Sequence, residues 1–419
     1  MKRPALLLLA AALALGGAAA AFVLSRGGGQ GSAPSTTTTV TRRPAKPRPK
    51  PPRFSWPLYG YDLARTHAAP SGLRLRPPFR KLWTVRGDWS LMEFPPVLEH
   101  GRLFLGTNHG LVLAVQAATG RVLWHRQFAG CVAASPAVGD GVVYLGFMNP
   151  PPCTGTAPSF VAALDARSGR RRWRFRAGVV ETPPLLAGGR VYFGSWDHRI
   201  YAVDARSGRL AWSFATGDRV KGGVALAGGT IFAGSYDGRV YALDARSGRL
   251  RWSAGDGGLG GLYSTPSVAN GRVFVGSTDG RVYAFSARSG EPLWSARTGS
   301  FVYSPAALWD GTAYVGSYDH RLYALSQATG AVRWTFDAHA PISGAPTVLD
   351  GLVYFSTCGS CSSYESNPRA RRTFAVDART GRLVWRFPDG EYSPVIADRE
   401  RVYLTGYTSL YGLAPSSRR

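Results

Sequence analysis

The sequence lacks any run of residues that is long and regular enough to form an amphipathic helix. Such a helix needs about 10–15 residues with apolar side chains at helical spacing, and no stretch of the chain offers them. Instead, 52 Gly and 29 Pro residues interrupt the chain at short intervals. This absence excludes a helical solenoid and favours many short β-strands joined by tight turns.

Acidic residues are scarce, with 25 Asp and Glu against 50 Lys and Arg, a formal net charge of +25. A surplus of this size occurs in proteins that bind nucleic acids or anionic surfaces. Here nearly all of the basic residues are Arg, and many lie in one repeated turn, "ARSGR". We therefore attribute the charge to a compositional bias of the repeat toward arginine, together with a basic tail, and we do not expect a nucleic-acid partner.

Charge is absent between Arg3 and Arg26, where 22 consecutive residues are uncharged and mostly Ala and Leu. That length suffices to span a bilayer, so residues 1–26 are expected to be a signal anchor. A cleaved signal peptide is the alternative, because "GGAAAA" offers small residues at a cleavage site. No Cys follows this run, which excludes the diacyl anchor of bacterial lipoproteins.

Residues 27–53 are a basic linker rich in Pro, Thr and Gly. Their composition cannot bury a core; the Gly and Ser residues make the start flexible, and the Pro-rich end is stiff. We expect a stalk that holds the following domain away from a membrane. Its basic residues are also suited to contact with acidic cell-envelope polymers.

One pattern, A-x-D-x-x-[ST]-G-x-x-x-W, recurs through the rest of the chain. Four copies keep the Asp: Ala163–Trp173, Ala202–Trp212, Ala242–Trp252 and Ala375–Trp385. Three looser copies have Gln116, Ser286 or Ser326 in its place: Ala114–Trp124, Ala284–Trp294 and Ala324–Trp334. Successive tryptophans are 39 to 51 residues apart, a period that predicts a solenoid, a propeller or another array.

Each repeat unit reads as four short antiparallel strands. In "STPSVANGRVFVGSTDGRVYAFSARSGEPLW", from Ser264, a short first strand precedes two alternating strands joined by a D-G hairpin, and the last strand carries Trp294. Four-stranded units of about 40 residues are typical of propeller blades. We therefore predict an all-β propeller over residues 54–415, followed by a short tail, 416–419.

The number of blades follows from the two ends of the repeat array. Seven copies end in Trp, and an eighth unit after Trp385 stops after three strands. Upstream, Phe79–Val85 ("FRKLWTV") carries Trp83 and can supply the missing strand. We predict an eight-bladed β-propeller whose last blade is closed by this N-terminal strand, which removes exposed sheet edges.

The repeated residues have scaffold roles. The Trp side chain offers a large flat face that seals one blade against its neighbour. The Gly permits the positive φ of a tight turn, and the Asp can accept hydrogen bonds from the turn's N–H groups. The tryptophans expected to dock in this way are Trp83, Trp124, Trp173, Trp212, Trp252, Trp294, Trp334 and Trp385.

The Ala-x-Asp-x-x-Thr-Gly-x-x-x-Trp signature resembles the tryptophan-docking motif of the PQQ-like β-propeller repeat family. The stretch "WPLYGYDLARTHAAP", from Trp56, looks like the segment in front of many such propellers. The family includes quinoprotein alcohol and glucose dehydrogenases. It also includes non-catalytic proteins, such as the lipoprotein of outer-membrane β-barrel assembly and the sensor domains of receptor kinases. The resemblance therefore implies the fold. It leaves open whether the chain is an enzyme or a non-catalytic protein.

For a quinoprotein dehydrogenase, the resemblance implies PQQ, a Ca²⁺ held by Glu, Asn and Asp, a catalytic Asp and, in many members, two adjacent cysteines. This chain has no adjacent cysteines and nearly minimal blades. We therefore expect a non-catalytic binding or assembly platform with no cofactor, whose partner is a protein or a cell-envelope polymer. A quinoprotein oxidoreductase using PQQ and Ca²⁺ and a carbohydrate-binding module are the alternatives.

The four cysteines are expected to form two disulfides. Cys131 precedes the second blade and Cys153 lies in a loop inserted into that blade, so both should reach one face. Cys358 and Cys361 form "CGSC" in a loop of the seventh blade, where a small structural disulfide is favoured over a redox site. Paired cysteines suit an oxidising compartment. We expect a single-pass cell-membrane protein with its propeller outside the cytoplasm, or a secreted protein as the alternative.

Two sets of residues on the same face are candidates for a binding site. Residues just ahead of the inner strands should point toward a funnel mouth: Glu93, Glu181, Lys221, Tyr263, Tyr303 and Glu391. Residues of the D-G hairpins, or equivalent to them, could form an aromatic rim: Trp196, Tyr236, Tyr318 and Tyr407. Such a rim could stack on sugars or hold a peptide, and packing within each hairpin is the alternative.

Overall fold

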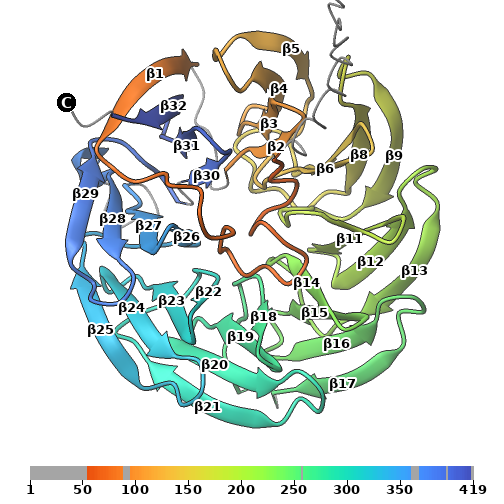
Figure 1. Cartoon of the computed structure of the whole chain (residues 1–419). Helices are drawn as coiled ribbons and strands as arrows, with labels where there is room; N and C mark the ends of the chain where they lie inside the picture. The colour runs from red at the N-terminus through yellow and green to blue at the C-terminus, as the bar shows by residue number, and fades with distance from the viewer. Residues whose placement is uncertain (1–53, 88–94, 256–257, 360–367, 393–394, 417–419) are drawn as a thin grey trace, which may run out of the picture. The chain divides into compact units, whose positions relative to one another are not determined.

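The computed structural model describes residues 54–87, 95–255, 258–359, 368–392 and 395–416. All of these residues belong to one unit, residues 52–419. Within them, eight four-stranded antiparallel sheets surround a common axis, as Figure 1 shows. The prediction of an eight-bladed all-β propeller is confirmed.

Each blade runs from an inner strand at the axis to an outer strand at the rim. Blade 1 contains β2 (Val97–Glu99), β3 (Arg102–Gly106), β4 (Leu111–Gln116) and β5 (Val122–Gln127). Blade 2 contains β6 (Ala137–Gly139), β7 (Val142–Gly146), β8 (Ser159–Asp165) and β9 (Arg171–Ala177). Blade 3 contains β10 (Leu185–Ala187), β11 (Arg190–Ser195), β12 (Arg199–Asp204) and β13 (Leu210–Ala215). Blade 4 contains β14 (Val224–Ala227), β15 (Thr230–Gly234), β16 (Val240–Asp244) and β17 (Leu250–Ala254).

The second half of the chain repeats this order. Blade 5 contains β18 (Ser267–Ala269), β19 (Arg272–Gly276), β20 (Arg281–Ser286) and β21 (Pro292–Arg297). Blade 6 contains β22 (Ala307–Trp309), β23 (Thr312–Gly316), β24 (Arg321–Ser326) and β25 (Val332–Asp337). Blade 7 contains β26 (Thr347–Leu349), β27 (Leu352–Ser356), the 3₁₀ turn η1 (Pro368–Ala370), β28 (Thr373–Asp377) and β29 (Leu383–Phe387). Blade 8 contains β30 (Val395–Ala397), β31 (Val402–Thr405), β32 (Ser409–Pro415) and β1 (Phe79–Arg86).

The ring is closed by β1, which comes from the start of the propeller sequence. It pairs with β32 from Phe79 opposite Pro415 to Arg86 opposite Ser409, with one irregularity between Lys81 and Trp83. The expected closing strand is therefore present and continues one residue beyond Val85. Because β1 pairs with β32, the third strand of blade 8 is not left as an exposed sheet edge.

The hydrophobic core lies between blades rather than within them. One cluster combines Leu185 and Ile200 of blade 3 with Val224, Ile231 and Leu243 of blade 4, all without solvent exposure. The two middle strands of a blade are buried on both faces, whereas the outer strand β17 alternates exposed and covered residues. Each sheet is thus stabilised by its neighbours.

The tryptophans dock as the repeat motif implies. The Nε1–H groups of Trp83, Trp124, Trp173, Trp212, Trp252, Trp294 and Trp334 each donate to a carbonyl oxygen of the next blade, at 3.0 to 3.2 Å. Trp385 faces blade 8, which lacks the A-x-D-x-x-[ST]-G turn. Its ring packs edge-on against that of Phe79 of β1, with 5.3 Å between the ring centroids. The closing strand thus replaces the missing docking turn at this boundary.

Residues 54–78, called the strap below, cross the propeller axis in front of the inner strands in Figure 1. The strap exchanges two backbone hydrogen bonds between Trp56 and Leu98 of blade 1. Its carbonyl groups then accept hydrogen bonds from inner strands of five further blades, through Val138, Leu226, Val268, Leu308 and Val348. A segment that is not itself in a sheet therefore ties together blades on both sides of the axis.

Blade 3 is held by the side chain of Arg65, which is fully buried in the strap. Its guanidinium donates to the carbonyl oxygens of Pro183 and Pro184 at 3.2 and 3.1 Å and to that of Val224 at 3.0 Å. It also donates to the carbonyl of Tyr59 within the strap. A delocalised cation with five N–H donors is well suited to so many converging carbonyl groups.

The expected localisation is corrected by the structure. Within the residues it describes, no helix is long and apolar enough to cross a membrane, so the prediction of a single-pass membrane protein is wrong on this finding. Residues 1–26, to which the span was assigned, and the linker 27–53 lie outside the described residues.

Candidate functional site

The propeller has two faces with different composition. The strap face carries the strap and the A-x-D-x-x-[ST]-G turns. The opposite face, called the funnel face, carries the hairpins between the second and third strands and the loops that lead into the inner strands. Because the strap covers one end of the axis, a ligand that reaches the axis must come from the funnel face.

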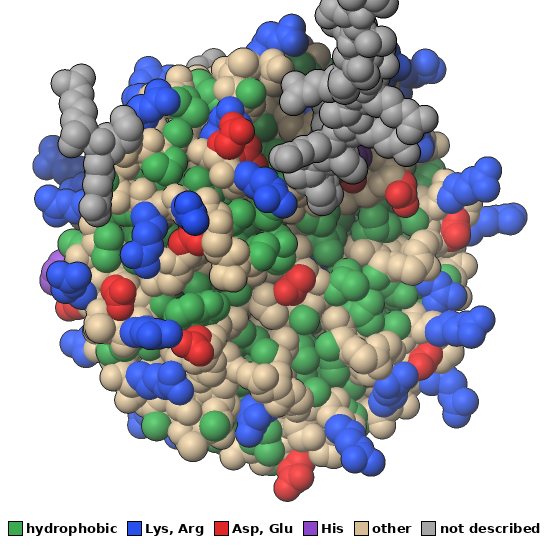
Figure 2. All heavy atoms as spheres, in the orientation of Figure 1, with side chains coloured by type: hydrophobic (Ala, Val, Ile, Leu, Met, Phe, Trp, Pro, Cys, Tyr) green, Lys and Arg blue, Asp and Glu red, His purple; other side chains and the backbone are tan. Residues whose placement is uncertain are grey.

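The strap face is basic at its rim, as Figure 2 shows, because the repeated turns carry arginines. A groove of about 590 Å³ lies where the strap meets blades 6 and 7. The groove mixes Arg76 and Arg379 with Asp350, and the Asp350 carboxylate already accepts a hydrogen bond from the Leu75 N–H. We assign this groove to the anchoring of the strap.

The residues that precede the inner strands by four positions form a ring on the funnel face. From blade 3 to blade 6 this position is held in turn by Glu181, Lys221 (three positions ahead of β14), Tyr263 and Tyr303. The structure brings these four together along one arc of the ring. Glu391 lies at the equivalent position of blade 8, and Glu93 lies outside the described residues.

Aromatic side chains fill this arc. The Tyr263 and Tyr303 ring centroids are 4.6 Å apart, and Tyr303 contacts Tyr318 at 5.0 Å. Tyr236 approaches Tyr263 at 6.3 Å, and Phe301 stacks on Tyr303 at 5.9 Å. The aromatic arc thus consists of Trp196, Tyr236, Tyr263, Phe301, Tyr303 and Tyr318. Phe301 was not predicted from the sequence, although its 46% exposure makes it the most accessible large apolar residue of the arc.

Glu181 is a buried acid that is bonded to two residues of the arc. Its carboxylate accepts hydrogen bonds from the Trp196 Nε1–H at 2.9 Å and from the Tyr263 hydroxyl at 2.7 Å. Burial raises the pKa of Glu181, and the nearby Lys221 ammonium and the two hydrogen bonds oppose that rise. Glu181 therefore fixes an indole of blade 3 and a phenol of blade 5 in place.

Lys221 stands among the aromatic rings. Its Nζ lies 4.4 Å from the Trp196 ring centroid, 5.0 Å from that of Tyr236 and 5.8 Å from that of Tyr263. Arg219 approaches the same Trp196 ring, with its guanidinium carbon 5.5 Å away. The rim aromatics of blades 3 and 4 thus face cations as well as other rings.

A second cluster lies in blades 7 and 8. Glu391 is 1% exposed and accepts a hydrogen bond from Arg371 Nε at 2.9 Å. The Arg371 guanidinium carbon lies 3.4 Å from the centroid of the Tyr407 ring. The sequence-predicted residues Glu391 and Tyr407 are therefore joined through Arg371.

The centre of the funnel is narrow. A cavity of about 20 Å³ is lined by Lys221, Tyr263 and Tyr303 on one side, and by Tyr59 of the strap, Ser343 and Tyr392. This volume holds about one water molecule. The strap thus supplies the floor of the funnel, and a ligand of any size contacts the arc from above this floor.

The hairpins hold their shape through internal bonds that the sequence did not reveal. Asp197 accepts hydrogen bonds from the Tyr201 hydroxyl at 2.8 Å and the Gly178 N–H at 2.8 Å. The same Asp-to-Tyr bond recurs four residues apart in Asp237 and Tyr241, Asp279 and Tyr283, and Asp319 and Tyr323. The spacing S-x-D-x-x-x-Y is the sequence signal for this bond. These aspartates are therefore structural.

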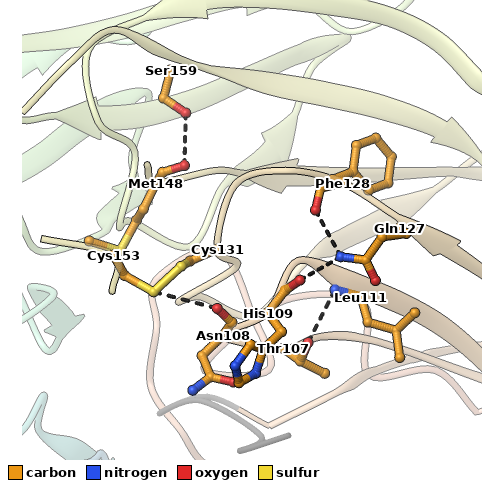
Figure 3. Close-up of a disulfide and its surroundings, with 10 residues drawn as sticks. All are labelled: Thr107, Asn108, His109, Leu111, Gln127, Phe128, Cys131, Met148, Cys153 and Ser159. Atoms are coloured by element: carbon orange, nitrogen blue, oxygen red, sulfur yellow. Dashed lines mark hydrogen bonds between the residues drawn. A yellow bond between two sulfur atoms is a disulfide. The ribbon is translucent and has the colours of Figure 1, made fainter. Parts of the chain in front are cut away.

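A disulfide joins Cys131 and Cys153, with Cα atoms 5.8 Å apart, as Figure 3 shows. The Cys153 Sγ lies 3.4 Å from the carbonyl oxygen of Asn108, in the hairpin of blade 1. Cys358 is also disulfide-bonded, and its Sγ lies 3.1 Å from the Glu391 carboxylate. Its expected partner Cys361 lies outside the described residues.

A quinone and calcium site would need oxygen ligands that converge on one point. Among the described residues, no three Asp, Glu, His or Cys side chains converge on a point where a metal ion could be held. The two described ring acids have other partners: Glu181 bonds Trp196 and Tyr263, and Glu391 bonds Arg371. We derive no catalytic step through such a cofactor.

Comparison with known proteins identifies the family. The family model described as outer membrane protein assembly factor BamB, a PQQ-like repeat model, matches residues 79–148, 153–219, 196–301 and 298–416. The chain belongs to this PQQ-like propeller family. The resemblance seen in the docking motif is therefore confirmed by matches that run through all eight blades of this BamB-like propeller.

Individual relatives are distant. The outer membrane protein assembly factor BamB of Nitrosomonas eutropha is 25% identical over 126 residues, which cover 30% of this chain and 28% of that protein. The chain thus aligns with less than a third of the length of this curated relative. The match concerns about three repeats of the BamB-like propeller.

Solved structures support the fold. BamB from Moraxella catarrhalis superposes with a TM-score of 0.63 at 18% identity, over 82% of this chain and 99% of that one. A quinohemoprotein alcohol dehydrogenase from Comamonas testosteroni superposes with a TM-score of 0.66 at 14% identity, over 87% of this chain and 81% of that one. The BamB structure and the dehydrogenase superpose about equally well, so the likeness shows the propeller fold of this BamB-family chain and says nothing of its activity.

Proposed function

We propose that this protein is a non-catalytic binding platform that holds a protein partner on its funnel face. The observation that carries the proposal is the aromatic arc with Lys221 and Glu181, which draws side chains from blades 3 to 6 onto one surface. Aromatic residues with a few charged neighbours are the typical composition of protein-binding hot spots. The family's description as an assembly factor supports a protein partner.

The geometry favours recognition over catalysis. The acid that a proton-transfer step would use, Glu181, accepts two hydrogen bonds from its own scaffold, and the described residues lack a convergent set of metal ligands. A binding platform needs neither an acid that is free to transfer a proton nor a set of metal ligands. Its requirement is a rigid surface, which a closed propeller with a strapped floor provides.

Site-specific photo-crosslinking in the native host tests the proposal. A photoreactive amino acid at Phe301 should give one or a few discrete protein adducts. The matched control is the same substitution at Arg206, exposed in a repeat turn of the strap face. The proposal fails if Phe301 gives no adduct, or if both positions give the same adducts.

The oxidoreductase alternative is tested separately. The purified chain is incubated with PQQ and Ca²⁺, and dye-linked oxidation of alcohols and sugars is measured. We expect no turnover above the protein-free control. Turnover that depends on both PQQ and the chain would overturn the platform proposal.

A further inference from the structure

Lysine is nearly absent from the propeller. Of the basic residues between 54 and 419, only Lys81 and Lys221 are lysines, and all others are arginines. Lys221 is the one that lies in the aromatic arc of the funnel face. A compact ammonium with three donors on a flexible stem differs in its chemistry from the surrounding guanidinium groups.

The local sequence explains how Lys221 reaches the arc. In blade 4 it is followed by Gly222 and Gly223. A Cβ on Gly222 would lie 2.6 Å from the carbonyl oxygen of Tyr263, and one on Gly223 would lie 2.9 Å from Pro183. Only glycine permits these close approaches to blades 5 and 3. Lys221 is thereby held against the aromatic rings of both neighbouring blades.

The ammonium group of Lys221 keeps its hydrogen-bond donors available. Its contacts are with the π faces of Trp196, Tyr236 and Tyr263. In the described part of the chain Lys221 has no hydrogen bond and no ion pair within 4 Å, and each oxygen of the nearby Glu181 carboxylate accepts a hydrogen bond from another residue. A partly covered cation with unused N–H donors favours an anionic group that completes its coordination.

The faces of the aromatic rings are largely covered by one another. Tyr303 is flanked by Tyr263, Tyr318 and Phe301, while Trp196 is covered by Lys221 and Arg219. A sugar ring would need an open aromatic face. The arc instead offers the positive charge of Lys221 and the exposed side of Phe301, which suits a carboxylate next to an apolar side chain.

We infer that Lys221 binds a carboxylate of an acidic peptide segment, and that Phe301 contacts an apolar side chain beside that carboxylate. This inference rests on the proposed function, because it names the chemistry of the partner segment that the funnel face holds. Arg219, exposed beside Trp196, adds a second positive charge for the same segment.

NMR of the full chain labelled with [ε-¹³C]lysine tests the inference. The probe is a short acetylated and amidated peptide of alternating Glu and Phe, and its control has Gln in place of Glu. The Lys221 signal should shift and saturate with the Glu peptide and not with the Gln peptide. Lys81, which lies on the Tyr411 ring of blade 8, is the internal control and should not shift.

Variants complete the test by fluorescence anisotropy with the same labelled peptide. Lys221→Met should weaken binding at least about tenfold, the scale of one lost hydrogen-bonded charge contact. Lys221→Arg should bind the peptide more tightly than Lys221→Met because it keeps the positive charge. Lys81→Met should bind as the unchanged chain does, and equal melting temperatures would exclude misfolding.

Three results would overturn the inference. The Gln peptide could shift Lys221 as the Glu peptide does, Lys221→Met could bind equally well, or only an acidic sugar such as oligogalacturonate could shift the signal. These results leave the platform proposal intact if Phe301 still gives protein adducts. Loss of those adducts counts against the platform itself.

Discussion

At the scale of the residue, the glycine of the repeated turn is explained by its contact with a tryptophan of the preceding blade. Gly248 has φ of +73°, and a Cβ built on it would lie 2.6 Å from the indole of Trp212 in the preceding blade. The glycine is therefore required twice, by its backbone conformation and by the ring that packs on it. The same contact recurs at Gly120, Gly169, Gly208, Gly290, Gly330 and Gly381.

The two requirements can be separated with a matched pair of variants. Gly271 has φ of +70°, but a Cβ there would meet nothing within 4 Å. Gly271→Ala should therefore cost only the backbone term, about 1–2 kcal/mol in the free energy of unfolding. Gly248→Ala should cost about 1–3 kcal/mol more, because the Trp212 ring must move. Urea unfolding measures both, and equal losses would show that the docking ring does not constrain the turn.

At the scale of the element, the strap is the part that repeat reasoning did not describe. It contains a buried guanidinium and a buried imidazole, those of Arg65 and His67, which are 0% and 2% exposed. His67 packs edge-on against Tyr59 at 4.7 Å. Burial, together with the positive charge of Arg65, lowers the pKa of His67 to about 3. The strap is therefore held in place with a neutral imidazole in its middle.

The strap should make stability depend on pH. Below its ordinary pKa of about 6.5, the unfolded His67 binds a proton that the folded residue does not bind, so acid favours unfolding. The free energy of unfolding should fall from about pH 6.5 toward pH 4, with a slope of up to about 1.4 kcal/mol per pH unit from this residue. His67→Gln should flatten the slope, whereas the exposed His339 changed to Gln should not. An unchanged slope in His67→Gln would show that the strap is open in solution.

At the scale of the whole molecule, the propeller is a ring of sheets that stabilise one another. The core clusters span neighbouring blades, and blade 8 is completed by a strand from the other end of the propeller sequence. The funnel site depends on this ring. Trp196, Lys221 and Tyr263 come from three successive blades, so their contacts require the correct angle between sheets.

Opening the ring tests this dependence. Replacement of Phe79–Arg86 by a Gly/Ser segment of equal length keeps the strap attached but removes the cover of β32. We expect a loss of at least about 3 kcal/mol in the free energy of unfolding, the scale of removing one buried aromatic anchor. The exposed strand edge should also cause self-association, seen by size-exclusion chromatography. An unchanged melting temperature and a monomeric elution would contradict the closed ring.

Much of the scaffold was predictable from the sequence, because its signals are local and repeated. The Trp spacing, the Gly turns and the alternating strands each report on a few neighbouring residues, and seven copies reinforce the same reading. The closing strand was predictable because one blade lacked a Trp strand and Phe79–Val85 supplied one. The positions of Glu181, Lys221, Tyr263 and Tyr303 ahead of the inner strands followed from the same alignment of repeats.

The sequence alone thus determined the eight-bladed architecture, because each repeat has one way to bury its apolar face, which is against the next repeat. Only the tertiary structure decided which side chains meet at the axis. The hydrogen bond of Tyr263 to Glu181, the Lys221 ammonium over Trp196 and the hydrogen bond of Arg65 to Val224 join residues 82, 25 and 159 positions apart. Such contacts depend on the angle and distance between sheets, which packing of the whole ring sets and no local pattern records.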